Sequence, residues 1–444
     1  MQRIPEEVRK VLRELEEGGY EAWCVGGCVR DLLMGRAPDD WDVTTSALPE
    51  ETLALFGARA IPTGLQHGTV TVRTDAGPVE VTTYRTDGTY RDHRRPESVV
   101  FTRSLREDLA RRDFTVNAMA MNASGEIYDP MDGRVDLAAG CLRCVGDPVC
   151  RFEEDSLRIM RGLRFASVLG FSIDRETSEG IRCKAELLKS IAVERIRVEM
   201  DKLLCGAGVE KILREYPDVL GVFLPEILPA VGFDQNTPYH CYDVWEHTIR
   251  SVAAAPREIV VRLTMLLHDL GKPAVYSEVD GCGHFYGHAK VSHRMAEDVL
   301  RRLKYDNETR ERVLVLIERH DGVLQPTEKS VRRALRVLGE TGLRRLLEVK
   351  RADNRAQAPA YANRQLEIDE LETMMEELLA QDACFSLKQL AVNGCDLMAL
   401  GLRGKEIGME LERLLSAVVD GNLPNQKEIL IESIKVQLKG QNTE

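Results

Sequence analysis

A change in hydrophobic pattern near residue 145 constrains the fold more than any other feature of this sequence. Before it, TVTVRT (69–74) and VEVTTYR (79–85) alternate as strands do, and the turn formers at 75–78 predict a hairpin between them. AWCVG (22–26) and WDVTT (41–45) predict two more strands, and a helical repeat covers residues 4–15. From about residue 150 onward the pattern is almost wholly helical. The sequence therefore predicts an α+β chain with a small mixed head followed by helical parts.

The length of the chain predicts more than one domain. Its 444 residues exceed what one ordinary hydrophobic core supports, so two to four domains are expected. The stretch 225–238, PEILPAVGFDQNTP, is rich in proline and turn formers and makes the best boundary. We expect a head at 1–145, a helical neck at 146–235, a third domain at 236–360 and a helical tail at 361–444.

Composition indicates an ordinary water-exposed protein. Hydrophobic residues make up 43% and charged residues 30%, and no apolar run approaches the roughly 18 residues that span a bilayer. The start, MQRIPEEVRK, lacks the apolar core of a signal peptide, and the eleven scattered cysteines favour reduced thiols in a cytoplasm. The net charge of −12 argues weakly against nucleic acid, because contacts are local. Arginines do cluster between 91 and 112, but the acids among them are typical of a solvated mixed surface.

The stretch 26–42, GGCVRDLLMGRAPDDWD, combines a glycine pair with two spaced carboxylates. Asp40 and Asp42 lie two residues apart at a predicted strand, so both side chains should share one face and bind Mg²⁺ together. Gly26-Gly27 before a helix offers backbone N–H groups to an anion. Glu80, on the predicted strand 79–85, is the candidate third acid. Each feature alone has an ordinary explanation: a tight turn, a solvated loop, or an edge-strand glutamate on the surface.

The order of several motifs resembles that of one enzyme family. GGCVRDLLMGRAPDDWDV resembles the first signature of the tRNA nucleotidyltransferases, the CCA-adding enzymes of the polymerase-β-like superfamily (bacterial, class II). Further similar segments follow in the family's order: RRDFTVNAMA (111–120), DPMDGRVDL (129–137), EEDSLRIMRGLRF (153–165), VERIRVEM (193–200) and residues 390–428. The resemblance implies a polymerase-β-like head that adds C, C and A to the tRNA 3′ end from CTP and ATP, releasing pyrophosphate without a nucleic-acid template.

The resemblance also implies roles for single residues of the head. Asp40, Asp42 and Glu80 would be catalytic, the two aspartates as Mg²⁺ ligands. Gly27 and Arg30 would contact the nucleotide. Arg112 could hold a phosphate bidentately, and Asp113 could accept a hydrogen bond from a ribose hydroxyl. Without the resemblance, Arg112 is equally well explained as a plain surface charge.

Asp155 and Arg158 are the candidate base-reading pair. Three residues apart, they are expected to be neighbours on one helix face and to imitate a Watson–Crick partner for C or A. The alternative is an ordinary helix-surface salt bridge. The resemblance makes Arg161 and Arg164 nucleotide contacts as well, although helical drift turns Arg164 to the side opposite Asp155.

RTDGTYRDHRRPESV (85–99) resembles the family's flexible loop. In that family, loss of the loop accompanies enzymes that add only CC. Its presence here favours addition of the terminal A.

A second cluster of motifs lies at 236–360. WEHTIRSV (245–252) and LTMLLHDLGKP (263–273) resemble the HD phosphohydrolase superfamily and supply His247, His268 and Asp269. The resemblance makes His288, His320, Asp321 and Asp353 further candidate ligands, and spacing leaves open whether Asp321 or Asp353 closes the site. Imidazoles with carboxylates suit Ni²⁺, Mn²⁺ or another transition metal better than Mg²⁺. The expected activity is that of a phosphatase or 2′,3′-cyclic phosphodiesterase; a core or surface His-Asp pair is the alternative.

Two other functions remain open from the sequence. A close rival is an A-adding tRNA enzyme or a bacterial poly(A) polymerase. A rival from another class is an HD phosphohydrolase whose nucleotidyltransferase-like half only binds RNA, against which the intact Asp40 and Asp42 argue. We expect a cytoplasmic protein with no membrane partner, and the oligomeric state stays open.

Overall fold

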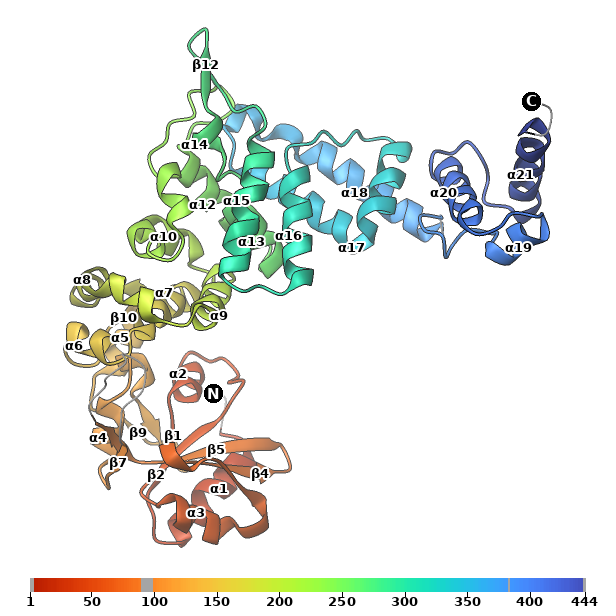
Figure 1. Ribbon diagram of the computed structural model, residues 1–444. Coiled ribbons are helices and arrows are strands. Elements are labelled where there is room, and N and C mark those ends of the chain that lie inside the picture. Colours follow the sequence, from red (N-terminus) through yellow and green to blue (C-terminus); the bar gives the residue numbers. More distant parts are fainter. Residues whose placement is uncertain (1–3, 89–98, 382–383, 442–444) are drawn as a thin grey trace. The chain divides into compact units, whose positions relative to one another are not determined.

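The computed structural model describes the chain except residues 1–3, 89–98, 382–383 and 442–444 (Figure 1). It consists of two compact units, Met1–Leu228 and Pro229–Glu444. The break between them falls inside the stretch 225–238 that the sequence marks as a boundary. The finer division into four parts stays a prediction. Most of the predicted flexible loop (85–99) lies outside the described residues.

The head of the first unit is built on a mixed seven-stranded sheet with strand order β3-β4-β5-β2-β1-β8-β9. Its central pair, β2 and β5, is parallel, and the other neighbours are antiparallel. Helices α1 and α3 contact each other and the sheet, and they lie together beside it in Figure 1. The strands are β1 (Ala22–Val25), β2 (Asp42–Thr45), β3 (Ala60–Gly64), β4 (Thr69–Thr74), β5 (Gly77–Thr83), β8 (Ala120–Met121) and β9 (Ile127–Tyr128).

The predicted hairpin and the first helix are confirmed. β4 and β5 pair from Thr69↔Thr82 to Thr74↔Gly77, so only residues 75–76 remain for the turn. Their alternate valines, at 70, 72, 79 and 81, are buried as the period of two requires. The helix α1 (Glu6–Glu17) buries its repeating Val8, Val11, Leu12 and Leu15 against the same core.

Helices dominate the first unit beyond the sheet. Two short two-stranded sheets accompany them: the antiparallel pair β6 (Arg85–Asp87) with β7 (Val99–Phe101), and the parallel pair β10 (Cys141–Leu142) with β11 (Ser172–Ile173). The α-helices are α2 (Gly27–Leu33), α3 (Pro49–Phe56), α4 (Leu105–Ala110), α5 (Gly133–Ala139), α6 (Pro148–Glu154), α7 (Leu157–Leu169), α8 (Arg175–Lys184), α9 (Val193–Leu204), α10 (Val209–Glu215) and α11 (Pro217–Leu220).

In the described part of the second unit, the hairpin of β12 (Ser277–Val279) and β13 (Cys282–His284) accompanies helices. Near the end of the chain, α19, α20 and α21 surround a separate apolar core that includes Leu397, Leu414 and Leu430. The helices are α12 (Val244–Ala254), α13 (Ile259–Leu267), α14 (Lys272–Val275), α15 (His288–Arg302), α16 (Asn307–Arg319), α17 (Glu328–Arg355), α18 (Gln365–Ala380), α19 (Gly394–Ala399), α20 (Lys405–Val419) and α21 (Lys427–Gln441).

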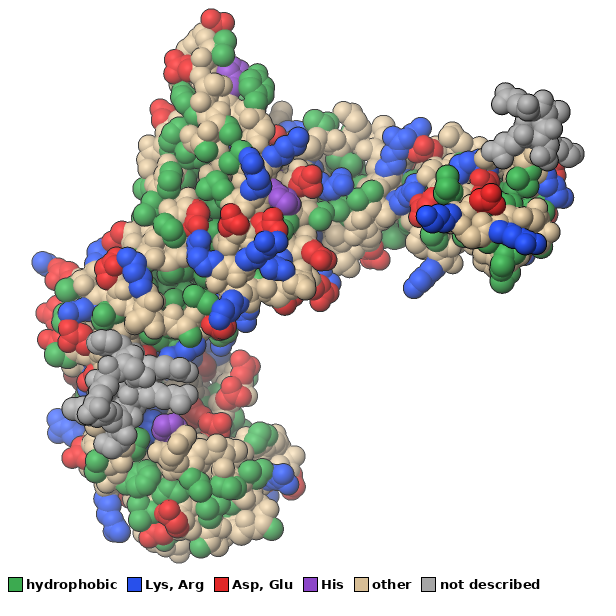
Figure 2. Space-filling view, viewed as in Figure 1, with side chains coloured by type: hydrophobic (Ala, Val, Ile, Leu, Met, Phe, Trp, Pro, Cys, Tyr) green, Lys and Arg blue, Asp and Glu red, His purple; other side chains and the backbone are tan. Residues whose placement is uncertain are grey.

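The predicted α+β class, with strands concentrated in the head and helices beyond it, is confirmed. Figure 2 shows acidic and basic side chains interspersed over the visible face. Among the described residues, no helix is both long and apolar enough to span a membrane.

Candidate functional site

The register of the central parallel strands places two of the predicted acids side by side. Asp42 opens β2 and lies directly across from Glu80 of β5, so the two side chains point to the same face of the sheet. Asp40 differs from its expectation, because it lies in a bend before β2 and not on the strand. Its negative charge nevertheless raises the pKa of Asp42. Burial raises the pKa of Asp42, the Arg112 guanidinium lowers it, and Glu80 and Asp40 raise it.

The three carboxylates therefore share one small region of the head. Oxygen donors that repel one another are stabilised by a hard divalent cation, which supplies the missing positive charge. This donor set fits Mg²⁺.

The glycine turn lies beside these acids. Gly26 has φ of 78°, a backbone conformation that side chains disfavour, and α2 begins at the next residue. A Cβ at Gly26 would come within 3.1 Å of Nη1 of Arg112 and 3.9 Å of Oδ2 of Asp42. Only glycine therefore lets the backbone approach both the acid and the arginine, and Gly27 opens the helix next to them.

A buried carboxylate holds Arg112 in this place. Asp108 is fully buried, and its Oδ2 lies 3.4 Å from Nη2 of Arg112, while its Oδ1 accepts from Arg111 at 2.8 Å. Thr44 of β2 also donates to Asp108, at 3.3 Å. Nε of Arg112 is buried without a hydrogen-bond partner. Sequence reasoning missed Asp108, because it lies just before the recognised RRDFTVNAMA segment.

A polar chain joins α2 to α7 through Asp113. Arg30 donates to Oδ1 of Asn117 at 2.7 Å, and Asn117 donates to Oδ1 of Asp113 at 3.2 Å. Arg161 donates to Oδ2 of Asp113 at 2.6 Å. Burial alone would raise the pKa of Asp113, but Arg161 and Asn117 outweigh burial and lower the pKa to about 2. Asp113 is thus ionised at neutral pH, and three predicted nucleotide contacts (Arg30, Asp113 and Arg161) belong to one network.

The expectation that Asp155 and Arg158 share one continuous helix face is wrong. Asp155 lies in an extended conformation between α6 and α7, where its Oδ1 accepts from the backbone N–H of Leu157 at 3.1 Å. Arg158 donates to Glu154 at 2.8 Å and to the carbonyl of Arg111 at 3.0 Å. The structure thus gives Arg158 a different carboxylate partner, Glu154.

Positive charges nevertheless surround Asp155. Burial raises its pKa, and Arg195, Arg158 and Arg161 oppose that rise. Arg195, on α9, was not singled out as a site residue, although it lies in the recognised segment VERIRVEM. Its Nη1 is buried without a hydrogen-bond partner, a donor that a bound ligand could satisfy.

Arg161 and Arg164 both flank the ring of Phe165. The guanidinium carbon of Arg164 lies 3.6 Å from the ring centroid, that of Arg161 lies 5.2 Å away, and that of Arg30 lies 5.3 Å away. Arg164 also donates to Glu199 of α9 at 2.8 Å. Cation–π contact with one buried ring therefore orients all three arginines.

The second unit brings six of the seven predicted HD residues into one buried cluster. His247 lies on α12, His268 and Asp269 follow α13, His288 opens α15, His320 follows α16, and Asp353 lies on α17. His247 Nε2 lies 2.9 Å from Oδ1 of Asp353 and 3.5 Å from Oδ2 of Asp269. On the other side, His288 Nε2 lies 3.2 Å from His320 Nε2 and 3.4 Å from Oδ1 of Asp269. Asp353 lies within the cluster, whereas Asp321 is exposed and lies outside it.

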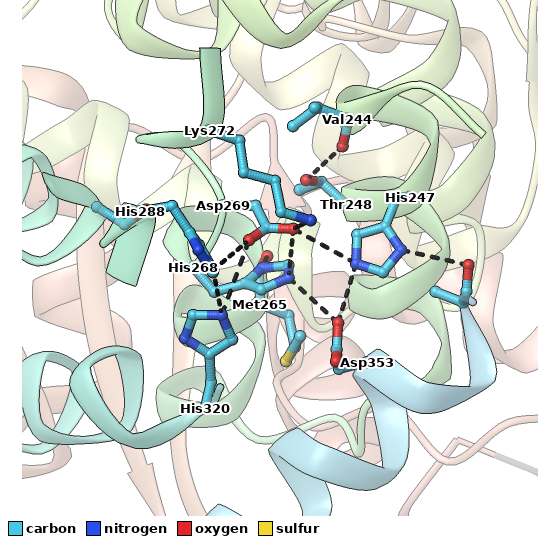
Figure 3. A network of polar contacts seen from close by, with 12 residues as sticks. Val244, His247, Thr248, Met265, His268, Asp269, Lys272, His288, His320 and Asp353 are labelled. Atoms are coloured by element: carbon cyan, nitrogen blue, oxygen red, sulfur yellow. Dashed lines mark hydrogen bonds and ion pairs between the residues drawn. The ribbon is translucent and has the colours of Figure 1, made fainter. Parts of the chain in front are cut away.

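Backbone carbonyls orient all four imidazoles, as Figure 3 shows in part. Each Nδ1 faces a carbonyl oxygen, which leaves each Nε2 free to turn toward the carboxylates. The pairs are His247 with Ala356 at 3.2 Å, His268 with Met265 at 2.7 Å, His288 with Phe285 at 2.9 Å, and His320 with Ile317 at 2.6 Å.

The cluster fits metal ions. Nε2 of His268 and both oxygens of Asp269 are buried and make no hydrogen bond of good geometry, although Asp269 forms an ion pair with Lys272 at 2.7 Å. Two ligand groups, His247–His268–Asp353 and His268–Asp269–His320, each have donor atoms within 4.8 Å of one another. Burial lowers the pKa of His268, yet Asp269 and Asp353 raise it to about 10, so these carboxylates favour a positive charge beside them. Imidazole with carboxylate is the donor set of a transition metal.

The mixed head sheet with adjacent acids beside a glycine turn defines a nucleotidyltransferase. Three family models match: the "Poly A polymerase head domain" at residues 22–143, the RNA- and SrmB-binding site of polymerase A at 170–229, and "tRNA nucleotidyltransferase domain 2" at 284–434.

Full-length relatives identify the group of nucleotidyltransferases to which the chain belongs. The chain is 34% identical to the CCA-adding enzyme of Lactiplantibacillus plantarum over 98% of its own length and 97% of the relative's. It is 35% identical to the CCA-adding enzyme of Bacillus pumilus, and the match covers 95% of this chain and 94% of the relative. A crystal structure of the Bacillus stearothermophilus CCA-adding enzyme in complex with CTP matches with a TM-score of 0.74 at 31% sequence identity. The match covers 99% of this chain and 98% of that one. The chain belongs to the family of CCA-adding enzymes, and the predicted family is confirmed.

Proposed function

We propose that this chain adds C, C and A to the 3′ end of tRNA from CTP and ATP, without a nucleic-acid template. The observation that carries the proposal is the strand register that sets Glu80 beside Asp42, with Asp40 close to both. Full-length relatives with the same activity in their names support it, and so does the relative whose structure holds CTP. The incoming nucleotide would supply an α-phosphate, and the tRNA 3′-hydroxyl would attack it.

In this reaction the acids of the head would bind the metal, and its glycine turn and Arg112 would bind the triphosphate. Asp40 and Asp42 would hold Mg²⁺, with Glu80 as the third catalytic acid beside them. When bound, the metal activates the attacking hydroxyl and stabilises the leaving pyrophosphate. Gly26-Gly27 offer backbone N–H groups to the triphosphate, and Arg112 adds a positive charge fixed by Asp108.

Base selection is assigned to the region around Asp155. Its carboxylate can accept from the exocyclic amino group that C and A share, and Arg158 can donate to ring nitrogen or carbonyl oxygen. The contact of Arg158 with Glu154 fixes the direction of its guanidinium. Arg30, Asp113, Arg161 and Arg164 then position the nucleotide through the network around Phe165.

Transfer should depend strictly on a divalent metal. Chelation of the purified chain should stop incorporation of labelled CTP into tRNA that lacks its CCA end, and Mg²⁺ should restore it. Incorporation that persists in excess chelator would contradict the assignment. The eleven cysteines of the sequence are scattered without the spacing of a disulfide framework, which supports a cytoplasm as the place of the reaction.

A second activity is proposed for the histidine cluster. The four converging Nε2 atoms and two carboxylates would hold Ni²⁺, Mn²⁺ or a similar ion and support phosphate ester hydrolysis. When bound, the metal supplies a water nucleophile of lowered pKa. The chain's own residues orient the ligands through the carbonyl contacts of their Nδ1 atoms.

The test compares hydrolysis of 4-nitrophenyl phosphate and of a nucleoside 2′,3′-cyclic phosphate by the full-length chain. Release of product with Ni²⁺ or Mn²⁺, and little with Mg²⁺, is expected. Equal and negligible release with all three metals would contradict the second activity.

A further inference from the structure

The turn Thr237–His240 lies beside the histidine cluster, outside the two HD-like segments at 245–252 and 263–273. The imidazole of His240 packs edge-on against that of His247, with ring centroids 4.7 Å apart and an interplanar angle of 86°. The backbone N–H of His240 donates to the carbonyl of Thr237 at 3.4 Å, which closes the turn. A side chain of the turn is therefore in direct contact with a proposed metal ligand.

The segment that carries this turn is anchored on both sides. Buried Gln235 accepts from Nζ of Lys272 at 2.8 Å, and the same Nζ lies 2.7 Å from Oδ2 of Asp269. The carbonyl of Asn236 accepts from the N–H of Gly283 at 2.7 Å, and that of Tyr239 accepts from the N–H of Ala358 at 2.9 Å. The turn is thus held in a defined place next to the cluster.

Two polar atoms of this turn have no partner. Nδ1 of His240 and Oγ1 of Thr237 are both buried without a hydrogen bond. A buried polar group without a hydrogen bond destabilises the folded chain, so such atoms are rare in native proteins and each one calls for an explanation. In the cluster beside them, Nε2 of His268 and Oδ1 of Asp269 are likewise buried without a hydrogen bond. A metal ion would satisfy the carboxylate and imidazole atoms of the cluster, whereas the free polar atoms of the turn can donate to the acceptor oxygens of an anion bound to that metal.

We propose that the turn Thr237–His240 binds the phosphoryl oxygens of phosphate esters at the histidine cluster, with Nδ1 of His240 and the hydroxyl of Thr237 as donors. This inference rests on the proposed second activity and names the residues that hold its substrate. Lys272, fixed between Gln235 and Asp269, adds a positive charge on the same side. A phosphate monoester offers three equivalent oxygens to these donors and to the metal.

Inorganic phosphate is the probe, and the full-length chain loaded with Mn²⁺ is the receptor. Calorimetry should show that His240→Ala weakens phosphate binding about tenfold, the loss expected for one hydrogen bond to a charged group. His240→Asn should stay within about threefold of wild type, because its amide nitrogen lies near the position of Nδ1. Thr237→Val should weaken binding in the same direction. Cys241→Ser, an exposed neighbour in the same segment, should bind like wild type.

Metal content and melting temperature are measured on every variant. A loss of Mn²⁺ from His240→Ala would make His240 a metal ligand or a packing residue, and it would overturn the inference. Equal phosphate affinity of wild type and His240→Ala, or no phosphate binding by wild type, would overturn it as well. If hydrolysis is absent but phosphate binding still depends on His240, the second activity fails while the phosphate site stands.

Discussion

Asp42 is the residue on which nucleotidyl transfer depends most. It is the first residue of β2, it faces Glu80 in register, and its pKa is raised by burial and by the neighbouring acids and lowered by Arg112. A carboxylate in such surroundings is stabilised in its charged form by a bound cation. The acid cluster therefore couples strand register directly to metal binding.

Asp42→Asn should lower the rate of CTP transfer by more than a thousandfold with an unchanged melting profile. The substitution keeps the size of the side chain and removes one of the charges that hold the metal. Single-turnover incorporation measures the loss. Asp39→Asn, an exposed neighbour in the same bend, is the matched control and should behave like wild type. Transfer by Asp42→Asn within tenfold of wild type would rule out its role as a metal ligand.

Asp155→Ala and Arg158→Ala should lose base selection while the metal site stays intact. Loss of a bidentate base contact costs about 1–3 kcal/mol of discrimination, or about 5- to 150-fold. Incorporation of all four nucleotides is compared, and slow use of UTP or GTP should appear as use of CTP and ATP declines. Arg175→Ala breaks an exposed ion pair with Glu179 on α8 and serves as control. Variants that keep the preference for CTP and ATP would place base reading elsewhere.

At the scale of elements, the close approach of α7 and α9 fixes the surroundings of Asp155. Gly206 follows α9, and a Cβ there would lie 2.1 Å from Oγ and 2.6 Å from the carbonyl carbon of Ser167. Ser167 donates to the carbonyl of Leu203 at 2.6 Å and accepts from the N–H of Gly208 at 2.7 Å. This contact cannot shift without displacing backbone, so it holds Arg195 and Glu199 of α9 against α7.

Gly206→Ala should destabilise the first unit by about 1–3 kcal/mol, the usual cost of overpacking, and should reduce transfer. Thermal unfolding followed together with CTP incorporation measures both effects. Gly408→Ala is the control, because a Cβ at that helical position meets no atom within 4 Å. It should leave stability unchanged or slightly raised. Equal stability of Gly206→Ala and wild type would mean that α7 and α9 can separate freely.

The sequence predicted these elements unequally well, for physical reasons. The hairpin of β4 and β5 and the place of Glu80 follow from alternation and turn chemistry, which are local. The break at Asp155 carries neither glycine nor proline, so the segment reads as one helix, whereas the packing of Arg158 on Glu154 and the backbone divides it. The choice of Asp353 over Asp321 depends on the packing of α17 against α12 and α13, which spacing along the chain does not contain. His240 lies in no recognisable motif, and only its contact with His247 in the structure indicates a role.

At the scale of the whole molecule, the two proposed sites belong to different compact units. The acids of the head lie in Met1–Leu228, and the histidine cluster lies in Pro229–Glu444. Each site has its own core and its own ligands, so substitution in one is expected to leave the chemistry of the other intact.

His268→Ala should abolish hydrolysis dependent on Ni²⁺ or Mn²⁺ and reduce the bound metal, while CCA addition continues at the wild-type rate. His268 is central because its Nε2 belongs to both ligand groups of the cluster. Metal analysis, phosphatase assay and tRNA extension are run on one preparation. His293→Ala, a histidine of α15 outside both ligand groups, is the control. A parallel fall of both activities with normal melting would show that the two sites are coupled.

One active site should build the sequence CCA without a template, and the length of the tRNA product measures this directly. The full-length chain is incubated with tRNA that lacks its CCA end, with CTP alone, with ATP alone and with both, and the products are sized at single-nucleotide resolution. Two added residues are expected with CTP, almost none with ATP alone, and three with both nucleotides. One added residue with ATP alone, or a long A tail, would contradict this expectation and identify an A-adding enzyme or a poly(A) polymerase instead.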